Sequence, residues 1–217
     1  TLTPRKGPQA ASVHVMPCEI THPCPPRRRY LHTGGMSSSH LLATSLAVPA
    51  IHPTAVVDSQ ADLAEDVEIG PLAVIESEVQ IGPGCRVGAR ASVKAGTTLG
   101  SNNTIAEGAI LGGRPQHVRA GGDLGGLIVG AGNHFRENVT IHRGLQPGED
   151  TVIGDGNYVM VNVHIAHDCH IGDHTIITNN AMLAGHVTIE DRAYISGAVA
   201  IHQFCRVGTM VMIGGNG

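Results

Sequence analysis

The sequence predicts an all-β fold, a parallel β-helix built from hexapeptide repeats. Three observations predict it: an aliphatic residue returns every six positions, a small side chain usually follows four positions later, and the chain has 29 Gly among 217 residues. A strand alternates its faces every two residues, so the first and fifth positions of a hexapeptide share one face, whereas a helix of 3.6 residues per turn cannot keep a period of six. Each unit is therefore a short strand with a turn, and three units of six, eighteen residues in all, make one coil.

The first positions of the repeat fall into three stretches of the chain. They continue without a gap from residue 51 to 111, and the same phase returns at residues 129–141 and 153–213. The residues at these positions are Ile51, Val57, Leu63, Ile69, Ile75, Ile81, Val87, Val93, Leu99, Ile105, Leu111, Val129, Phe135, Ile141, Ile153, Val159, Ile165, Ile171, Ile177, Leu183, Ile189, Ile195, Ile201, Val207 and Ile213. One coil cannot bury its apolar side alone, so we expect the coils to stack around a continuous core. Second positions are often glycine, as at Gly70, Gly82 and Gly154, which predicts corners that need the backbone freedom of glycine.

The repeat is interrupted twice, over residues 112–128 and 143–151, by glycine-rich polar sequence. These segments predict loops extruded from the coils, and loops on a rigid scaffold commonly carry binding residues. The first loop contains Gln116, His117 and Arg119, which are polar donors suited to a polar or anionic ligand.

The two ends of the chain lead to separate expectations. Residues 1–50 lack the repeat and are rich in proline and arginine, which predicts a disordered leader. The chain begins with Thr1, so Met36 is a candidate for the true start and the leader for a non-native segment. The β-helix domain spans residues 51–217, and because the repeat is still running at Gly217, we expect this domain to be incomplete at its C-terminus.

Composition and cysteine usage exclude several classes of function. The formal net charge of −4 gives no basic excess that would favour nucleic acid, and no apolar run approaches the ~20 residues of a membrane span. Cys85, Cys169 and Cys205 occupy fifth positions, so we expect them to be buried and unreactive. The sequence contains no CxxC pair of the kind that indicates zinc binding or redox chemistry. This cysteine usage is compatible with a reducing compartment and predicts a cytoplasmic location.

Histidines and one glycine line up when the chain is wound in coils of eighteen residues. None of the nine histidines within the repeat region occupies a first or fifth position, so we expect them to face outward or to lie at corners. Adding eighteen to His167 gives Gly185, and adding eighteen again gives Gln203, so these three residues form one column on successive coils. Three further histidines lie beside this column: His164, His186 and His202. Adjacent rungs are about 4.8 Å apart, so the column predicts a compact cluster of polar groups.

Four short motifs carry a specific resemblance. The segments HIAHDC at 164–169, LAGHV at 183–187, IHQFC at 201–205 and TIHRG at 140–144 resemble the UDP-N-acetylglucosamine O-acyltransferases that begin lipid A synthesis. The resemblance covers residues 51–217 and implies a left-handed coil and a homotrimer with its sites between neighbouring prisms. It also implies transfer of an (R)-3-hydroxyacyl group from acyl carrier protein to the 3-hydroxyl of UDP-N-acetylglucosamine.

The resemblance also assigns roles to particular residues. It implies that His167 is the general base, that Asp168 supports it, and that the backbone N–H of Gly185 stabilises the oxyanion. The implied substrate-binding residues are Gln116, His117, Arg119, His164, His186, His202, Gln203 and Gly215. Two of these differ from the family pattern, because His117 and Arg119 stand where the family has Asp and Lys. Gly215 matches a position that measures acyl length in the family, and glycine there predicts room for a longer chain.

Two other functions remain open at the level of sequence. A zinc-dependent hydratase of the carbonic-anhydrase type can be built on the same trimeric prism with three histidine ligands. A non-catalytic repeat module could also carry outward histidines on a binding face. The acyltransferase prediction itself requires no cofactor and no metal ion.

Overall fold

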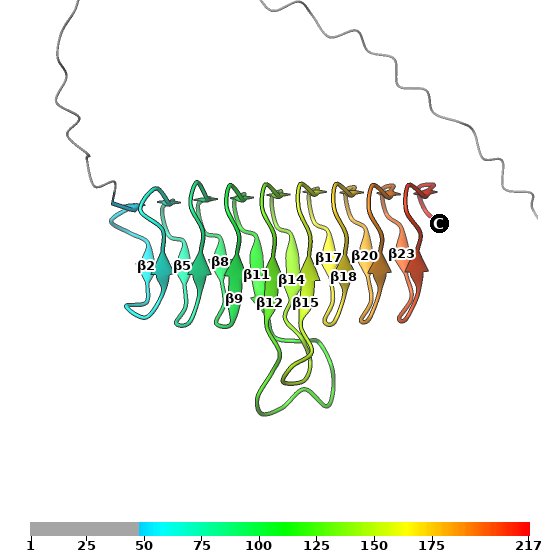
Figure 1. Cartoon of the computed structure of the whole chain (residues 1–217), viewed down its shortest axis with the longest axis horizontal. Helices are drawn as coiled ribbons and strands as arrows, with labels where there is room; N and C mark the ends of the chain where they lie inside the picture. The colour runs from blue at the N-terminus through cyan, green and yellow to red at the C-terminus, as the bar shows by residue number, and fades with distance from the viewer. Residues whose placement is uncertain (1–47) are drawn as a thin grey trace, which may run out of the picture. The chain divides into compact units, whose positions relative to one another are not determined.

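The computed structural model describes residues 48–217, which wind into a left-handed parallel β-helix (Figure 1). Most of the predicted leader, residues 1–47, lies outside the described residues. Strands that are three apart in the chain pair in parallel, and the register Ala50↔Glu68 and Ile51↔Ile69 shows the eighteen-residue coil directly. The predicted all-β fold class is confirmed.

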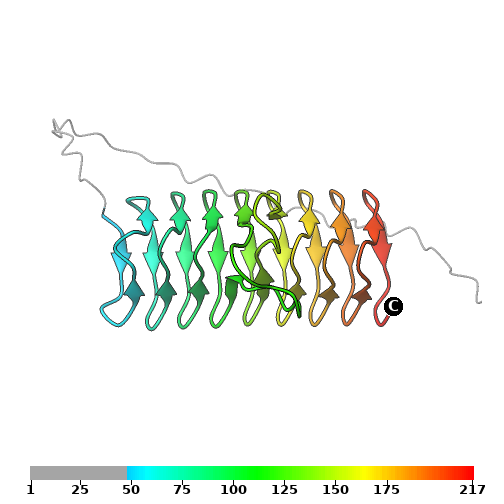
Figure 2. The ribbon, with the colours of Figure 1, turned by 90° about the horizontal axis from the view of Figure 1, so that it is seen from below.

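The strands form three sheets, one on each side of the coils (Figure 2). The nine-stranded sheet contains β1 (Ala50–Ile51), β4 (Glu68–Ile69), β7 (Arg86–Val87), β10 (Thr104–Ile105), β13 (His134–Phe135), β16 (Tyr158–Val159), β19 (Ile176–Ile177), β22 (Tyr194–Ile195) and β25 (Met212–Ile213). One eight-stranded sheet contains β2 (Val56–Val57), β5 (Val74–Ile75), β8 (Ser92–Val93), β11 (Ile110–Gly113), β14 (Thr140–His142), β17 (His164–Ile165), β20 (Met182–Leu183) and β23 (Ala200–Ile201). The other contains β3 (Asp62–Leu63), β6 (Gln80–Ile81), β9 (Thr97–Leu99), β12 (Leu127–Val129), β15 (Thr151–Ile153), β18 (His170–Ile171), β21 (Thr188–Ile189) and β24 (Arg206–Val207).

The core is made of first and fifth positions, as predicted. Ile165 and Phe135 at first positions and Val163 at a fifth position are completely buried. Fifth positions also carry a buried polar ladder, in which the Oδ1 atom of Asn133 accepts the backbone N–H of Asn157 at 2.8 Å. Such hydrogen bonds make a buried amide tolerable in an aliphatic interior.

The prediction that second-position glycines provide unusual backbone freedom is wrong. Positive φ angles recur instead at fourth positions, for example 59° at Leu72 and 59° at Asp168. Gly82 has no such angle, but a Cβ built on it would lie 2.8 Å from the backbone carbon of Gly100 on the next coil. Glycine is therefore needed at Gly82 because adjacent coils approach closely.

Both predicted loops are present, with slightly narrower limits. The first runs over residues 114–126 between β11 and β12, and the second over residues 143–150 between β14 and β15. Both protrude from the same edge of the coils (Figure 1). Arg143, at the start of the second loop, connects the first loop to the β-helix. Its guanidinium donates to the carbonyl oxygen of Ala95 at 2.6 Å and to that of Gly125 in the first loop at 2.5 Å. Nothing within residues 48–217 forms a helix that could cross a bilayer.

One cysteine differs from its predicted environment. Cys85 and Cys169 are buried, as expected, whereas Cys205 is exposed. Cys205 also occupies a fifth position, but it lies on the last coil of the chain, where no further coil covers it.

Candidate active site

The site is built on one corner of the coils, between the sheet that contains β17 and the sheet that contains β18. Asp168, His186 and Phe204 occupy the fourth position of this corner on successive coils, with φ angles of 59°, 61° and 62°. The His186 N–H donates to the carbonyl oxygen of His167 at 3.0 Å, and the Phe204 N–H donates to that of Gly185 at 3.3 Å. The predicted alignment of residues separated by eighteen is therefore confirmed.

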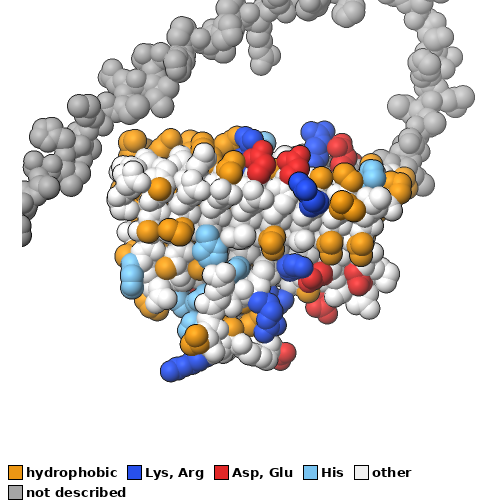
Figure 3. Space-filling view, turned by 180° about the vertical axis from the view of Figure 1, so that it is seen from behind, with side chains coloured by type: hydrophobic (Ala, Val, Ile, Leu, Met, Phe, Trp, Pro, Cys, Tyr) orange, Lys and Arg blue, Asp and Glu red, His pale blue; other side chains and the backbone are white. Residues whose placement is uncertain are grey.

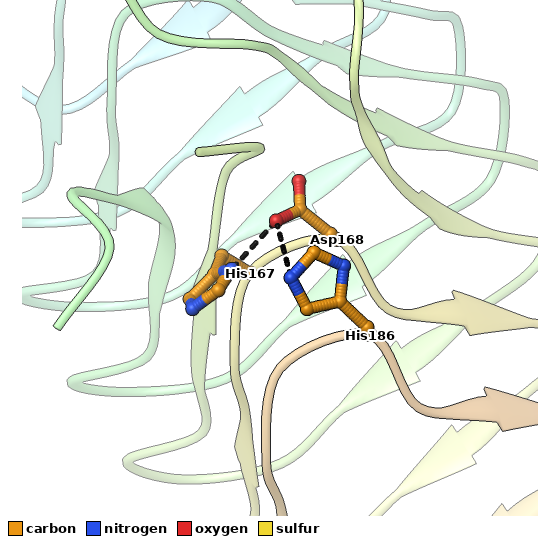
Figure 4. A group of neighbouring side chains, drawn as sticks. All are labelled: His167, Asp168 and His186. Atoms are coloured by element: carbon orange, nitrogen blue, oxygen red, sulfur yellow. Dashed lines mark hydrogen bonds and ion pairs between the residues drawn. The ribbon is translucent and has the colours of Figure 1, made fainter. Parts of the chain in front are cut away.

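His167 and Asp168 form a close pair at this corner (Figure 4). The Nδ1 atom of His167 lies 2.6 Å from Oδ2 of Asp168, and the two residues are 5% exposed. Side chains of neighbours on a strand point apart, but the left-handed backbone of Asp168 turns its carboxylate back toward the preceding imidazole. His167 lies at a corner, as predicted, and its imidazole is buried against the rings of His117 and His186.

The extruded second loop holds the Asp168 carboxylate. The backbone N–H of Leu145 donates to Oδ1 of Asp168 at 3.0 Å, which leaves Oδ2 directed at His167. The Asp168 N–H donates to the hydroxyl of Thr151 at 2.8 Å. Both faces of the residue are thus fixed by the segment that interrupts the repeat.

His186 approaches the same carboxylate from the next coil. Its Nε2 atom lies 3.5 Å from Oδ2 of Asp168, and its ring meets the ring of His167 edge to face at 5.2 Å. On its other side, the imidazole stacks on Phe204, with ring centroids 4.6 Å apart and an angle of 10° between the rings. One carboxylate oxygen therefore faces two imidazoles (Figure 4).

Gly185 allows this close packing. A Cβ built on Gly185 would lie 2.7 Å from Cε1 and 2.8 Å from Nε2 of His167. The Gly185 N–H donates to no partner among the hydrogen bonds of the described residues, so it is free to bind a group placed beside His167. An imidazole bonded to a carboxylate through Nδ1 and free at Nε2 can accept a proton from a bound hydroxyl group.

The comparisons with known proteins agree with this arrangement. Residues 78–113 and 150–185 match the family model described as bacterial transferase hexapeptide (six repeats). The chain is 50% identical over 167 residues to the acyl-[acyl-carrier-protein]–UDP-N-acetylglucosamine O-acyltransferase of Stenotrophomonas maltophilia (strain R551-3), an alignment that covers 76% of this chain and 64% of the relative. It is 53% identical over 165 residues to the protein of the same name from Xylella fastidiosa, with coverages of 76% and 63%.

Solved structures give the same result. The UDP-N-acetylglucosamine acyltransferase of Bacteroides fragilis matches with a TM-score of 0.74 and 41% identity, over 76% of this chain and 65% of that one. The structure of LpxA from Acinetobacter baumannii matches with a TM-score of 0.75 and 42% identity, with the same coverages. The chain is therefore similar in sequence and fold to UDP-N-acetylglucosamine O-acyltransferases. It spans less than two thirds of the length of the curated relatives named above.

A second pair of histidines, His142 on β14 and His164 on β17, lies beside the main cluster. The Nδ1 atom of His164 lies 2.8 Å from the hydroxyl of Thr140, and its ring meets that of His142 edge to face at 4.8 Å. Burial lowers the pKa of His164. It also lowers the pKa of His142 to about 4, with smaller contributions from His164 and His167. Both imidazoles are therefore neutral at physiological pH.

His142 is the residue that the sequence analysis missed. It is 7% exposed, and its Nδ1 atom is buried without a hydrogen-bond partner. His142 lies in the segment TIHRG, which already contributed to the resemblance, but it occupies a second position that was predicted to face outward. The end of β11 packs on this position, because Gly113 pairs with His142 across the sheet and a Cβ built on Gly113 would lie 3.1 Å from Cδ2 of His142.

The predicted substrate-binding residues are distributed around the cluster. His164 and His202 line a pocket of about 380 Å³ with Met182, Leu183, Ala184, Ala200 and Ile201. The neighbouring Gln203 is exposed, and its carbonyl oxygen lies 3.4 Å from Nδ1 of His202. Figure 3 shows histidine side chains gathered on the surface beside the protruding loops.

The first loop brings one of its three predicted residues to the cluster. The ring of His117 meets that of His167 edge to face at 5.7 Å. Gln116 and Arg119 are exposed, and within residues 48–217 their side chains make no hydrogen bond or ion pair. Gly215 lies beside Gly197 of the preceding coil, and a Cβ built on Gly215 would be 3.3 Å from the Gly197 carbonyl oxygen. This corner follows β22 and β25, so it differs from the corner of His167, which follows β17.

The two buried cysteines, Cys85 and Cys169, are unsuited to act as nucleophiles. Burial raises the pKa of the Cys169 thiol to about 12, and the thiol lies 3.2 Å from the carbonyl oxygen of Ala184. Burial also raises the pKa of Cys85. A thiol that stays protonated at neutral pH is a poor nucleophile.

Proposed function

We propose that this protein transfers an (R)-3-hydroxyacyl group from acyl carrier protein to the 3-hydroxyl of UDP-N-acetylglucosamine, the first step of lipid A biosynthesis. The observation that carries the proposal is the 2.6 Å contact between His167 Nδ1 and Asp168 Oδ2, with Gly185 packed against the same imidazole. The similarity to the relatives from Stenotrophomonas and Xylella supports the proposal. The names of both relatives specify acyl-[acyl-carrier-protein] as the donor and UDP-N-acetylglucosamine as the acceptor.

His167 is the general base in this proposal. A sugar hydroxyl is a poor nucleophile at neutral pH, and Nε2 of His167 accepts its proton as the oxygen attacks the thioester carbonyl carbon. The carbon–sulfur bond then breaks, and the imidazolium returns the proton to the departing thiolate. Asp168 accepts the Nδ1–H of His167, which fixes the tautomer with a free lone pair on Nε2 and stabilises the transient imidazolium.

Gly185 supplies the group that stabilises the oxyanion. Negative charge develops on the thioester oxygen during attack, and a backbone N–H aimed at that position stabilises it. The Gly185 N–H has no partner in the described residues and lies on the coil next to His167. The absence of a side chain permits the acyl group to approach both groups at once.

The surrounding residues bind the two substrates. His164, His186, His202 and Gln203 are proposed to contact the acceptor and the acyl group. The first-loop residues Gln116, His117 and Arg119 are proposed to contact the sugar nucleotide. Arg119 can pair with a phosphate, for which a guanidinium is well suited. Gly215 is proposed to leave room at the end of the acyl chain.

The assembly and location are further parts of the same proposal. We expect a homotrimer in which the histidine cluster lies in a cleft between the β-helices of neighbouring subunits, because the cluster occupies the outside of one corner. We expect the protein to work in the cytoplasm, where acyl carrier protein and UDP-N-acetylglucosamine are available.

The test compares the chain with its His167→Ala variant in the presence of hydroxyacyl carrier protein and UDP-N-acetylglucosamine. We expect thioester consumption by the parent to exceed that of the variant by about 10²- to 10⁴-fold, the usual contribution of a general base. His174→Ala is the control, because His174 is an exposed corner histidine on a different edge of the coils. Equal rates for parent and His167→Ala would remove His167 from the mechanism, and an inactive parent would favour a non-catalytic binding module.

The metal-dependent alternative differs from the observed cluster. Within residues 48–217, the group of side chains that could hold a metal ion is His167, Asp168 and His186. The hydratase alternative requires three histidine ligands, whereas this group has two histidines and one carboxylate. We therefore propose the acyltransferase function alone.

A further inference from the structure

The three side chains at the corner also have the composition of a transition-metal site. One ring nitrogen from each of His167 and His186 and a carboxylate oxygen of Asp168 all lie within 4.8 Å of one another, and the His167 nitrogen that faces Asp168 is Nδ1. Two imidazoles with one carboxylate suit Zn²⁺, Co²⁺, Ni²⁺ or Cu²⁺, whereas Mg²⁺ and Ca²⁺ prefer oxygen ligands throughout. We propose that this cluster binds a divalent transition-metal ion such as Zn²⁺, and that the bound ion inhibits the protein. The inhibition, but not the binding, rests on the proposed function.

The distances are close to those that a metal ion requires. Zn²⁺ binds nitrogen and carboxylate oxygen at about 2.0–2.2 Å, so ligand atoms around a tetrahedral ion lie roughly 3.3–3.5 Å apart. The Asp168 Oδ2 atom is 2.6 Å from His167 Nδ1 and 3.5 Å from His186 Nε2. Small rotations of the His167 and Asp168 side chains would therefore admit the ion.

The ligands are already held from outside the cluster. The Leu145 N–H bonds Oδ1 of Asp168 and leaves Oδ2 for the imidazoles, while Phe204 stacks on the ring of His186. Outer contacts of this kind orient metal ligands and strengthen binding. Phe204 is 73% exposed and has a φ of 62°, so its stacking on His186 is a specific feature of this corner and not a consequence of core packing.

A fourth position for water or another ligand is available. Asp168 and His186 line a pocket of about 360 Å³, together with Gly148, Glu149, Asp150 and His170. Three protein ligands with one open position form the usual arrangement of an accessible zinc site.

Metal binding at His167 Nδ1 would remove the general base. The ion takes the Nδ1 lone pair, so the ring proton must move to Nε2, and the neutral imidazole has no lone pair left for the sugar hydroxyl. Asp168 simultaneously exchanges its hydrogen bond to His167 for a bond to the metal. No proton is gained or lost by the imidazole, and the inhibition is reversed when a chelator removes the ion.

Binding is tested by titrating the full chain with Zn²⁺ by calorimetry and with Co²⁺ by absorption, and by comparing the parent with His186→Asn and His174→Asn. These two histidines are a matched pair, because both are fourth-position residues with φ angles of 61° and 54°, and asparagine tolerates that conformation. We expect His186→Asn to lose one equivalent of bound metal and His174→Asn to match the parent. Other histidines and cysteines contribute equally to all three proteins, so identical titrations would overturn the proposed site.

Inhibition is tested with the acyl-transfer assay. At free Zn²⁺ about ten times the dissociation constant, roughly a tenth of the sites remain empty, so we expect the parent rate to fall about tenfold and to recover with chelator. The residual activity of His186→Asn should not respond in that range, which separates site binding from capture of the product thiol by zinc. An unchanged or increased parent rate would overturn the inhibition. A parent without acyl transfer even when metal-free would contradict the proposed function, while the titrations would still decide the metal site.

Discussion

Oδ2 of Asp168 lies 2.6 Å from Nδ1 of His167, although the two residues are consecutive in the chain. Their side chains converge because Asp168 has a φ of 59° at the corner that follows β17. Leu145 in the second loop and Thr151 at the start of β15 then hold this residue in place. The proposed catalytic pair is thus formed by one residue with a left-handed backbone conformation and one interruption of the repeat.

Asp168→Asn is expected to lower kcat for acyl transfer by about 10²-fold or more with little change in KM. An amide can donate to Nδ1 and stabilise the tautomer that has its proton on Nε2, which is the wrong tautomer for a base. Steady-state kinetics with both substrates measure this split. The control is Asp62→Asn, an exposed carboxylate on β3. A kcat equal to that of the parent would show that Asp168 does not set the state of His167.

Gly185→Ala is expected to lower activity by at least about 10²-fold while the protein stays folded. The new Cβ would lie 2.7 Å from the His167 ring, so the imidazole must move, and misplacement by about 1 Å can reduce a rate by that factor. Gly197→Ala is the matched control, because Gly197 also occupies a third position and its nearest neighbour would be 3.5 Å away. Equal losses in both variants would indicate a general effect on the coils instead of displacement of His167.

Gly82→Ala is expected to destabilise the β-helix by roughly 1–3 kcal/mol, because its Cβ would lie 2.8 Å from the backbone of Gly100. Backbone atoms cannot rotate away as a side-chain end can, so the adjacent coils would have to separate. Gly214→Ala tests the same second position where nothing lies within 4 Å. Urea unfolding followed by circular dichroism measures both, and similar midpoints would contradict the close-packing explanation.

His142→Phe is expected to change how stability depends on pH. Burial in the folded protein lowers the pKa of His142 from its ordinary value of 6.5 to about 4, so between these values the unfolded chain binds a proton that the folded chain does not. Stability contributed by neutral His142 is therefore complete above about 6.5 and is lost as the pH falls toward 4, by at most ~1.4 kcal/mol per pH unit.

Unfolding free energies measured across this pH range should fall less steeply for His142→Phe than for the parent. His164, whose pKa is also lowered by burial, keeps its own contribution in both proteins. His134→Phe is the control because His134 is an exposed residue of β13. The same slope for parent and His142→Phe would mean that His142 is not kept neutral by burial.

Much of the site could be predicted because the repeat has a constant length, so the position of a residue in the coil follows from its number in the chain. Once the coil length is eighteen residues, the column of His167, Gly185 and Gln203 follows by addition, and the burial of Ile165 follows from its first position. The exposure of Cys205 shows the limit of this reasoning, since a fifth position is buried only when another coil covers it.

Other features depend on contacts that the period does not encode. His142 and His167 lie outside the aliphatic core and are buried by their neighbours: His142 packs against Gly113 and His164, and His167 packs against His117 and His186. The assignment of left-handed angles to fourth positions could not be derived from the distribution of glycines, since Leu72, Asp168 and His186 adopt them as well.

The sequence by itself determined the coil, its core and the approximate grouping of the histidines, because these depend only on strand alternation and a constant repeat length. The tertiary structure alone decided that Asp168 faces two imidazoles, that Leu145 and Phe204 hold the partners in place, and that His117 lies against His167. These relationships depend on how corner residues turn and where an irregular loop folds back. Neither property is set by the period of the aliphatic side chains.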